Sequence, residues 1–132
     1  MTSVRKTYPP NYPEIVRAFP WIKGRHGIVF AWSGLIYNPS GHDLPQDVFV
    51  HEETHFAQQR NQPERWWAEY IANPAQRYVW ELEAYRNQIT FAKQYYKASE
   101  VAKLAERCAV SLSSPMYGSL CSKDDAKRDI LA

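Results

Sequence analysis

The sequence is poor in residues that would supply covalent stability or membrane insertion. Its 132 residues include only two cysteines, Cys108 and Cys121, which are too few for a disulfide framework. We expect reduced thiols, as in a cytosolic protein, with a Cys108–Cys121 disulfide as the alternative for a virion-associated one. No run of about 18 apolar residues occurs, so we expect no membrane contact. The N-terminal segment lacks the apolar stretch of a secretory signal.

An excess of charge of one sign is also missing. The 16 lysines and arginines nearly balance the 14 acidic residues, the net charge is +2, and the basic residues are scattered. Nucleic-acid binding requires a basic stripe or patch, so we expect no nucleic-acid partner. Aromatic residues, in contrast, are abundant, with five Trp and nine Tyr. They predict a core of large flat side chains or a groove lined by them.

Local patterns predict a β-hairpin followed by helices. Residues 27–32 and 35–37 have strand composition and flank the two-residue turn Ser33-Gly34. Helices are expected from Asp43, as a capping residue with Gln46 in a capping box, to about residue 60, and then over 63–72. The remaining helices are expected over 74–97 (capped by Asn73), from about 99 to 110, and from Ser122 onward.

This order of elements predicts an α+β fold rather than alternating βαβ units. We expect one domain over residues 1–132. Within it, residues 1–25 read as an irregular lead-in with a short helix near 14–19, because four prolines interrupt them. Residues 111–132 are expected to form a C-terminal loop and a short helix.

The segment after the hairpin contains His51-Glu52-Glu53-Thr54-His55, an HExxH pattern. Residues four apart on a helix lie one above the other, so both imidazoles can reach one zinc ion at about 2.0–2.1 Å. The helical repeat rotates Glu52 by about 100° from His51, which sets it beside the ion as a base for a metal-bound water. The pattern predicts one Zn²⁺ per chain. The alternative is two histidines satisfied by carboxylates on a helix surface.

These residues resemble the HExxH zincin metallopeptidases. The metzincin branch requires a glycine and a histidine where this chain has Gln58 and Asn61. What remains is similar to a minimal gluzincin, which implies a glutamate on a following helix as third metal ligand. The resemblance covers residues 27–90. Across most of the chain, the sequence also resembles short zincin-like proteins encoded by tailed phages, which implies a zinc site and little about the substrate.

Two glutamates, Glu81 and Glu83, can supply the third ligand. They differ by about 200° around the helix, so only one can face the metal. We favour Glu83, because Ala84 after it allows close helix approach and because the E-A-Y run resembles the ligand helix of gluzincin-like proteins. Glu81 is expected to pair with Arg77 one turn earlier.

Further candidates have weaker support. Tyr117 lies beside Gly118 in a loop and is the candidate donor to a developing oxyanion, with loop packing as the alternative. His26 and His42 flank the hairpin and could line the cleft, although surface histidines are commoner. Tyr85 and Trp80 have the spacing of core aromatics.

Together these features predict a zinc metallopeptidase acting on a peptide or protein, with the substrate paired to an exposed edge of the 27–37 hairpin. The alternative is a non-catalytic zincin-shaped structural or adaptor protein, for instance a phage morphogenesis component with a structural zinc. Hydrolysis of a non-peptide amide is a third possibility. Other phage or host proteins are further candidate partners, and the expected location is cytoplasmic or virion-associated.

Overall fold

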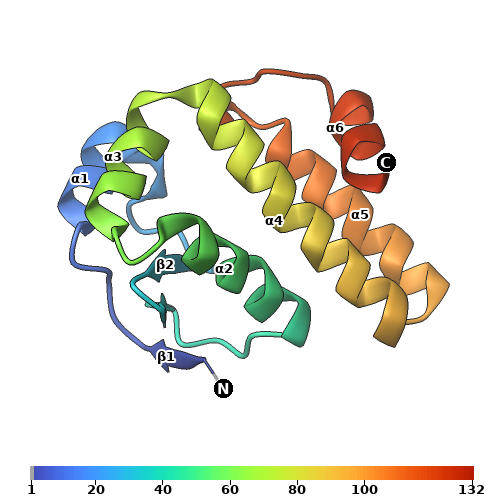
Figure 1. Ribbon diagram of the computed structural model, residues 1–132, viewed down its shortest axis with the longest axis horizontal. Coiled ribbons are helices and arrows are strands. Elements are labelled where there is room, and N and C mark those ends of the chain that lie inside the picture. Colours follow the sequence, from blue (N-terminus) through green and yellow to red (C-terminus); the bar gives the residue numbers. More distant parts are fainter. Residues whose placement is uncertain (1) are drawn as a thin grey trace.

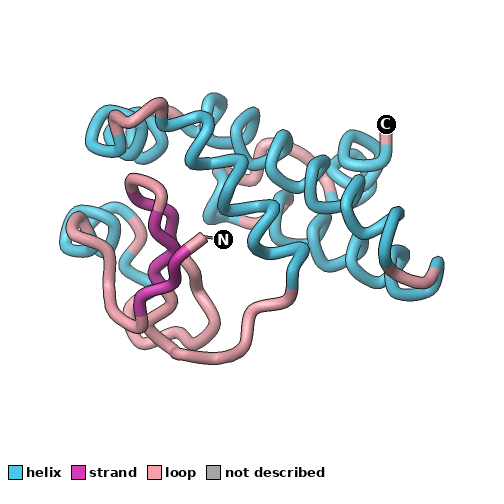
Figure 2. Tube along the Cα trace, turned by 60° about the horizontal axis from the view of Figure 1, so that its bottom comes forward, coloured by secondary structure: helices cyan, strands magenta, loops and turns pink. Residues whose placement is uncertain are grey.

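The computed structural model describes residues 2–132 and places a small three-stranded sheet beside a helical assembly (Figure 1). Strands β2 (Phe30–Trp32) and β3 (Leu35–Tyr37) form the hairpin that the sequence predicts. Strand β1 (Ser3–Arg5) pairs in parallel with β3, so the order is β1-β3-β2. Figure 2 shows the three strands side by side.

The turn between β2 and β3 depends on two left-handed residues. Ser33 has φ 50° and Gly34 has φ 79°. Two consecutive positive φ angles belong to a type I′ turn, whose twist matches that of the flanking strands. Ile36, at the centre of the sheet, pairs with both Val4 and Ala31 and is fully buried.

The helices follow the hairpin, apart from one short helix that precedes it, and the α+β class is confirmed. Their bounds are α1 (Tyr12–Ala18), α2 (Gln46–Gln59), α3 (Pro63–Ala72), α4 (Pro74–Tyr95), α5 (Ala98–Leu112) and α6 (Lys123–Leu131), with single 3₁₀ turns η1 (Pro20–Ile22) and η2 (Pro115–Tyr117).

Two of the three capping residues behave as predicted. Asn73 Oδ1 accepts a hydrogen bond from Gln76 N at 3.2 Å, and Ser122 Oγ accepts one from Asp125 N at 3.1 Å. The prediction for Asp43 is wrong. Helix α2 begins only at Gln46, and the extended Pro45 occupies its N-cap position without any side-chain cap.

The segment expected to be an irregular lead-in contains β1 as well as α1. Strand β1 was not predicted, because its three side chains are all exposed and leave no alternating pattern. The predicted break near residue 99 falls slightly earlier, where Tyr96 and Lys97 separate α4 from α5. Cys108 is buried on α5, Cys121 is partly exposed, and both thiols are free.

Helix α2 lies between the sheet and α4 (Figure 1). Its opposite sides contact β2 and α4, and α4 in turn packs against α3, α5 and α6. A residue on the α4 side of α2 is therefore covered by protein in several directions.

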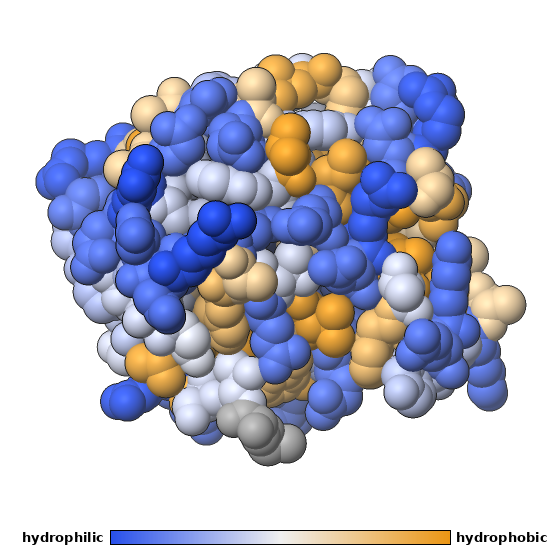
Figure 3. Space-filling view, in the orientation of Figure 1, coloured by the Kyte–Doolittle hydropathy of each residue, from blue (hydrophilic) through white to orange (hydrophobic). Residues whose placement is uncertain are grey.

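The outer face in Figure 3 mixes polar and apolar side chains. Within residues 2–132, no helix is both long and apolar enough to cross a membrane.

Candidate metal centre

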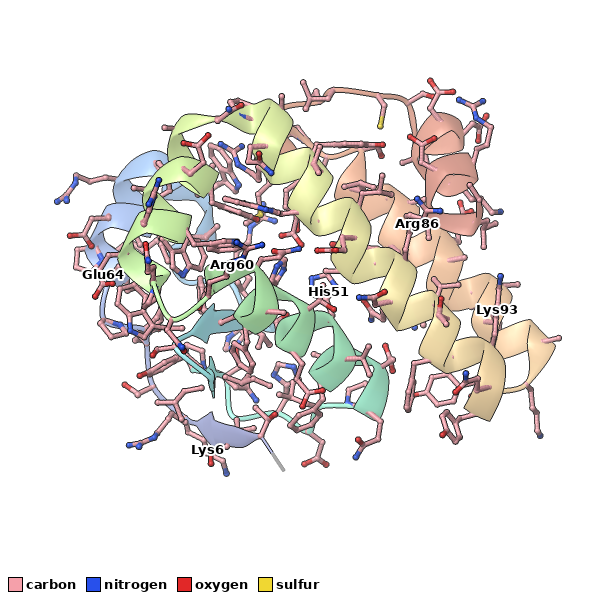
Figure 4. The ribbon with its side chains drawn as sticks, in the orientation of Figure 1. Lys6, His51, Arg60, Glu64, Arg86 and Lys93 are labelled. Carbon is pink, nitrogen blue, oxygen red and sulfur yellow. The ribbon has the colours of Figure 1, made fainter. Side chains whose placement is uncertain are left out.

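Three side chains from α2 and α4 meet in the protein interior. His51 Nε2 lies 3.1 Å from Glu81 Oε1, His55 Nε2 lies 3.0 Å from the same oxygen, and the two nitrogens are 3.2 Å apart. All three residues are buried. Figure 4 shows His51 in the space between α2 and α4. This group could hold a metal ion.

The distances match the ligand spacing of a small tetrahedral ion. Ligand atoms about 2.0–2.1 Å from a tetrahedral metal lie about 3.3 Å from one another. The three atoms of this centre are 3.0–3.2 Å apart, so a shift of a few tenths of an ångström would admit such an ion. Two imidazole nitrogens and a carboxylate oxygen are also a donor set that zinc accepts.

Each histidine makes a hydrogen bond to a glutamine through its second ring nitrogen, Nδ1. His51 Nδ1 lies 2.9 Å from Gln88 Oε1, and His55 Nδ1 lies 2.9 Å from Gln58 Oε1. Metal-binding imidazoles typically donate their second ring N–H to an oxygen in this way. Both rings consequently turn the other nitrogen, Nε2, toward Glu81.

Glu52 borders the centre. Its Oε2 lies 3.9 Å from His51 Nε2, and its side chain is 9% exposed. No donor within residues 2–132 makes a hydrogen bond to this carboxylate. The Glu52 oxygens are not among the buried unpaired atoms of residues 2–132, so the carboxylate keeps some contact with solvent beside the histidines.

The electrostatics of the cluster favour positive charge. Burial alone lowers the pKa of His55, but the Glu81 carboxylate overrides it and raises that pKa to about 9. Burial alone raises the pKa of Glu81, yet the two imidazoles hold it well below its usual range. Burial raises the pKa of Glu52, with the histidines partly opposing it. The centre therefore attracts a cation, whether a proton or a metal.

Aromatic side chains enclose the centre. Tyr70 donates a hydrogen bond to Glu81 Oε2 at 2.6 Å, which leaves Oε1 facing the histidines. The Tyr85 ring contacts His51 at 4.6 Å between centroids, and the Trp66 ring contacts His55 at 5.2 Å. The role of Tyr70 was not predicted, although its position on a short amphipathic helix beside two tryptophans was a signal for the core.

The structure brings Glu81, and not the expected Glu83, to the two histidines. Glu83 is exposed and accepts a hydrogen bond from Gln58 Nε2 at 2.7 Å instead of facing the histidines. The expected Arg77–Glu81 pair is also absent from the ion pairs of residues 2–132. Arg77 is buried and donates to the backbone carbonyls of Tyr70, Ile71 and Met116.

The other residues predicted from the sequence are not part of the three-residue group. Tyr117 is buried, with its hydroxyl 3.3 Å from that of Tyr85, so it stands behind Tyr85 in the structure. His26 and His42 are exposed and outside the three-residue group. Trp80 stacks on Trp66 at 5.0 Å and belongs to the aromatic shell, as its spacing suggested.

The edge of β2 nearest to α2 is already hydrogen-bonded. Gln59 Nε2 donates to Ala31 O at 2.8 Å, and Gln59 Oε1 accepts from Ser33 N at 3.0 Å. Trp67 Nε1 also donates to Ala31 O, at 3.0 Å. A peptide pairing with this part of the hairpin would have to displace Gln59.

Comparisons of the chain with protein-family models, with curated proteins and with solved structures give no match. The functional interpretation therefore depends on the residues of the centre and their geometry.

Proposed function

We propose that this protein is a zinc-dependent hydrolase that acts on peptide bonds. The observation that carries the proposal is the position of Glu52, whose carboxylate lies 3.9 Å from His51 Nε2 and borders three converging ligand atoms. A site that only bound metal would have no need of this residue. A water bound to a metal at this centre would be a hydrogen-bond donor that Glu52 could accept from.

Each residue then has a defined role. His51, His55 and Glu81 hold the ion and leave a fourth position, as catalytic zinc sites do. A zinc ion there would lower the pKa of a bound water toward 7. Glu52 would be the base that takes a proton beside the ion and returns it to the leaving amine. Tyr70 holds Glu81 with one oxygen directed at the histidines.

A structural or adaptor protein with a stabilising zinc is the second candidate, and burial is the observation that favours it. The side chains of His51, His55 and Glu81 are 10%, 5% and 6% exposed, and aromatic rings cover them. A substrate would reach the ion only if some of these covering side chains moved. A metal that never meets a substrate would serve stability alone.

The test compares wild-type protein with Glu52→Gln, because this change removes the base and keeps the side-chain shape. Protein purified without a metal-affinity tag is first analysed for metal, and we expect close to one zinc per chain. Both proteins are then incubated with a degenerate peptide library, and the products are read by mass spectrometry. Wild-type protein should release products that Glu52→Gln does not, while both retain zinc.

Three outcomes decide between the candidates. Zinc in both proteins and cleavage only by the wild type supports the hydrolase. Zinc in both without any difference in cleavage favours the structural candidate. Loss of zinc from Glu52→Gln to the same extent as from His51→Ala would make Glu52 a ligand and would overturn its assignment as the base.

A further inference from the structure

We infer that Gln58 and Gln88 are positioning residues that fix both histidines for metal binding, and that each is oriented by a carboxylate of its own. The arrangement is a pair of relays, Asp47–Gln88–His51 and Glu83–Gln58–His55. The inference rests on the metal site of the proposed function and is independent of hydrolysis.

The relay behind His51 runs through the interior. Gln88 Nε2 donates to Asp47 Oδ2 at 2.6 Å, and Asp47 Oδ1 accepts from Tyr96 Oη at 2.7 Å. An ionised carboxylate only accepts hydrogen bonds, so the amide must turn its NH₂ group toward Asp47. The amide oxygen then faces His51 Nδ1, which lies 2.9 Å away.

The relay behind His55 reaches the surface. Gln58 Nε2 donates to Glu83 Oε1 at 2.7 Å and to the Trp80 carbonyl at 3.0 Å. Both partners only accept, so the orientation of this amide is fixed as well. Its oxygen faces His55 Nδ1 at 2.9 Å.

These orientations determine the tautomers of the two histidines. An amide oxygen cannot donate, so each Nδ1 carries a proton, and Nε2 is the atom of each ring that remains for a metal. Both Nε2 atoms lie 3.0–3.1 Å from Glu81 Oε1, where a proton or a metal ion can bridge them to the carboxylate. The relays therefore preorganise the centre for a metal.

The experiment titrates Co²⁺ into metal-stripped protein and follows its visible absorption, with zinc affinity from competition. Outer-shell partners of this kind typically contribute 10–100-fold to metal affinity. We expect Gln58→Leu and Gln88→Leu each to weaken binding by about that range and to change the cobalt spectrum. Glu83→Gln should weaken it less, by about two- to fivefold, because Trp80 O still orients the amide. Gln94→Leu, at an exposed position on α4, is the matched control.

A charge-swapped double variant separates positioning from general stability. In Gln58→Glu alone, two carboxylates would face each other and binding should weaken. In Gln58→Glu/Glu83→Gln, a carboxylate again accepts from His55 Nδ1 while the new amide donates to it. This pair should recover part of the affinity that Gln58→Glu loses, but not all of it, because a carboxylate oxygen then faces the Trp80 carbonyl. A positive coupling in the mutant cycle would show that the two positions act together, and no recovery at all would contradict the relay.

Failure of the relays and failure of the metal site itself give different results in these titrations. Absence of any Co²⁺ or Zn²⁺ binding to wild-type protein would overturn the metal site itself. Tight binding to wild type and equal binding to Gln58→Leu would overturn the relays. Gln88 is buried, so Gln88→Leu counts only if its circular dichroism is native, whereas the partly exposed Gln58 keeps the test available.

Discussion

Adjacent glutamines at the end of α2 have different tasks because the helix rotates their side chains by about 100°. Gln58 turns toward α4 and holds His55, whereas Gln59 turns toward the sheet and holds β2. From the sequence, Gln58 was interpreted only as a mismatch to a metzincin pattern. Its position three residues after His55 places it one turn away on the same face, which is where an orienting partner can lie.

The helical spacing of the sequence favours Glu81 over Glu83, but the partners of Glu81 on other helices cannot be assigned from it. Glu81 shares its helix face with Ala84, Tyr85 and Gln88, at the spacing i, i+3, i+4 and i+7, and all four are buried. That periodicity was a signal for Glu81, but the resemblance around Glu83 was given more weight. The partners Tyr70 and Gln88 could not be assigned, because their contacts cross between helices.

Substitution of the two glutamates tests which of them binds the metal. Glu81→Ala removes the proposed third ligand, so zinc affinity should fall by more than roughly 100-fold, beyond what loss of a residue that only orients a ligand causes. Glu83→Ala removes only a partner of Gln58 and should cost less than about tenfold. Competition against a chromophoric chelator measures both. Comparable losses in the two variants, or a larger one for Glu83→Ala, would contradict Glu81 as ligand.

At the level of elements, local signals were predictable and distant pairings were not. The Ser33-Gly34 turn, the Asn73 cap and the Ser122 cap all involve residues within a few positions of one another, and each occurs as predicted. Strand β1 depends on pairing Val4 with Ile36, which no local pattern reveals. The free edge of β2 is likewise covered by a hydrogen bond from Gln59 to the Ala31 carbonyl, two residues that are far apart in the sequence.

The Gln59 side chain covers the β2 edge in the way that a residue of a neighbouring strand would. In a parallel ladder, one residue donates to the carbonyl of residue i and accepts from the N–H of residue i+2. The Gln59 amide makes this pair of bonds with Ala31 O and Ser33 N, so it replaces one residue of a neighbouring strand. An exposed edge invites pairing with other chains, and a covered one avoids it.

Removal of the Gln59 amide should therefore weaken the hairpin locally. Gln59→Ala leaves Ser33 N–H without its partner, and we expect a loss of about 1–2 kcal/mol in the free energy of unfolding. The amide of Ser33 should also exchange with solvent faster. Chemical denaturation and hydrogen exchange measure the two effects, with the exposed Gln62→Ala as control. An unchanged exchange rate of the Ser33 amide in a destabilised variant would show that the Gln59 amide does not hold the strand.

On the scale of the whole molecule, the centre lies where three packed helices meet. Helix α2 supplies His51, His55 and Glu52, α4 supplies Glu81, and α3 supplies Tyr70 and Trp66. A metal bound there would tie these helices together in the folded state alone, so binding energy would become folding energy. Removal of the metal should lower the melting temperature.

The pH dependence of stability separates a metal-filled centre from a protonated one. The Glu81 carboxylate, working against burial, raises the pKa of His55 to about 9. The unfolded value is about 6.5. Because the folded state holds this proton more tightly, the ion pair stabilises the protein fully below about pH 6.5, and its contribution is lost as the pH rises through about 9.

Metal binding has the opposite sign, since zinc requires both imidazoles to be neutral and competes with protons for them. The stabilisation by a ligand grows as its dissociation constant falls. The rise in melting temperature on adding one equivalent of zinc should therefore increase between about pH 5.5 and pH 8. Metal-stripped protein should instead lose melting temperature from about pH 6.5 upward. Thermal unfolding with and without a chelator measures both trends. Glu81→Ala should abolish both, because the same carboxylate holds the proton and the metal. A zinc effect that stayed constant or shrank with rising pH would rule out the two-histidine centre.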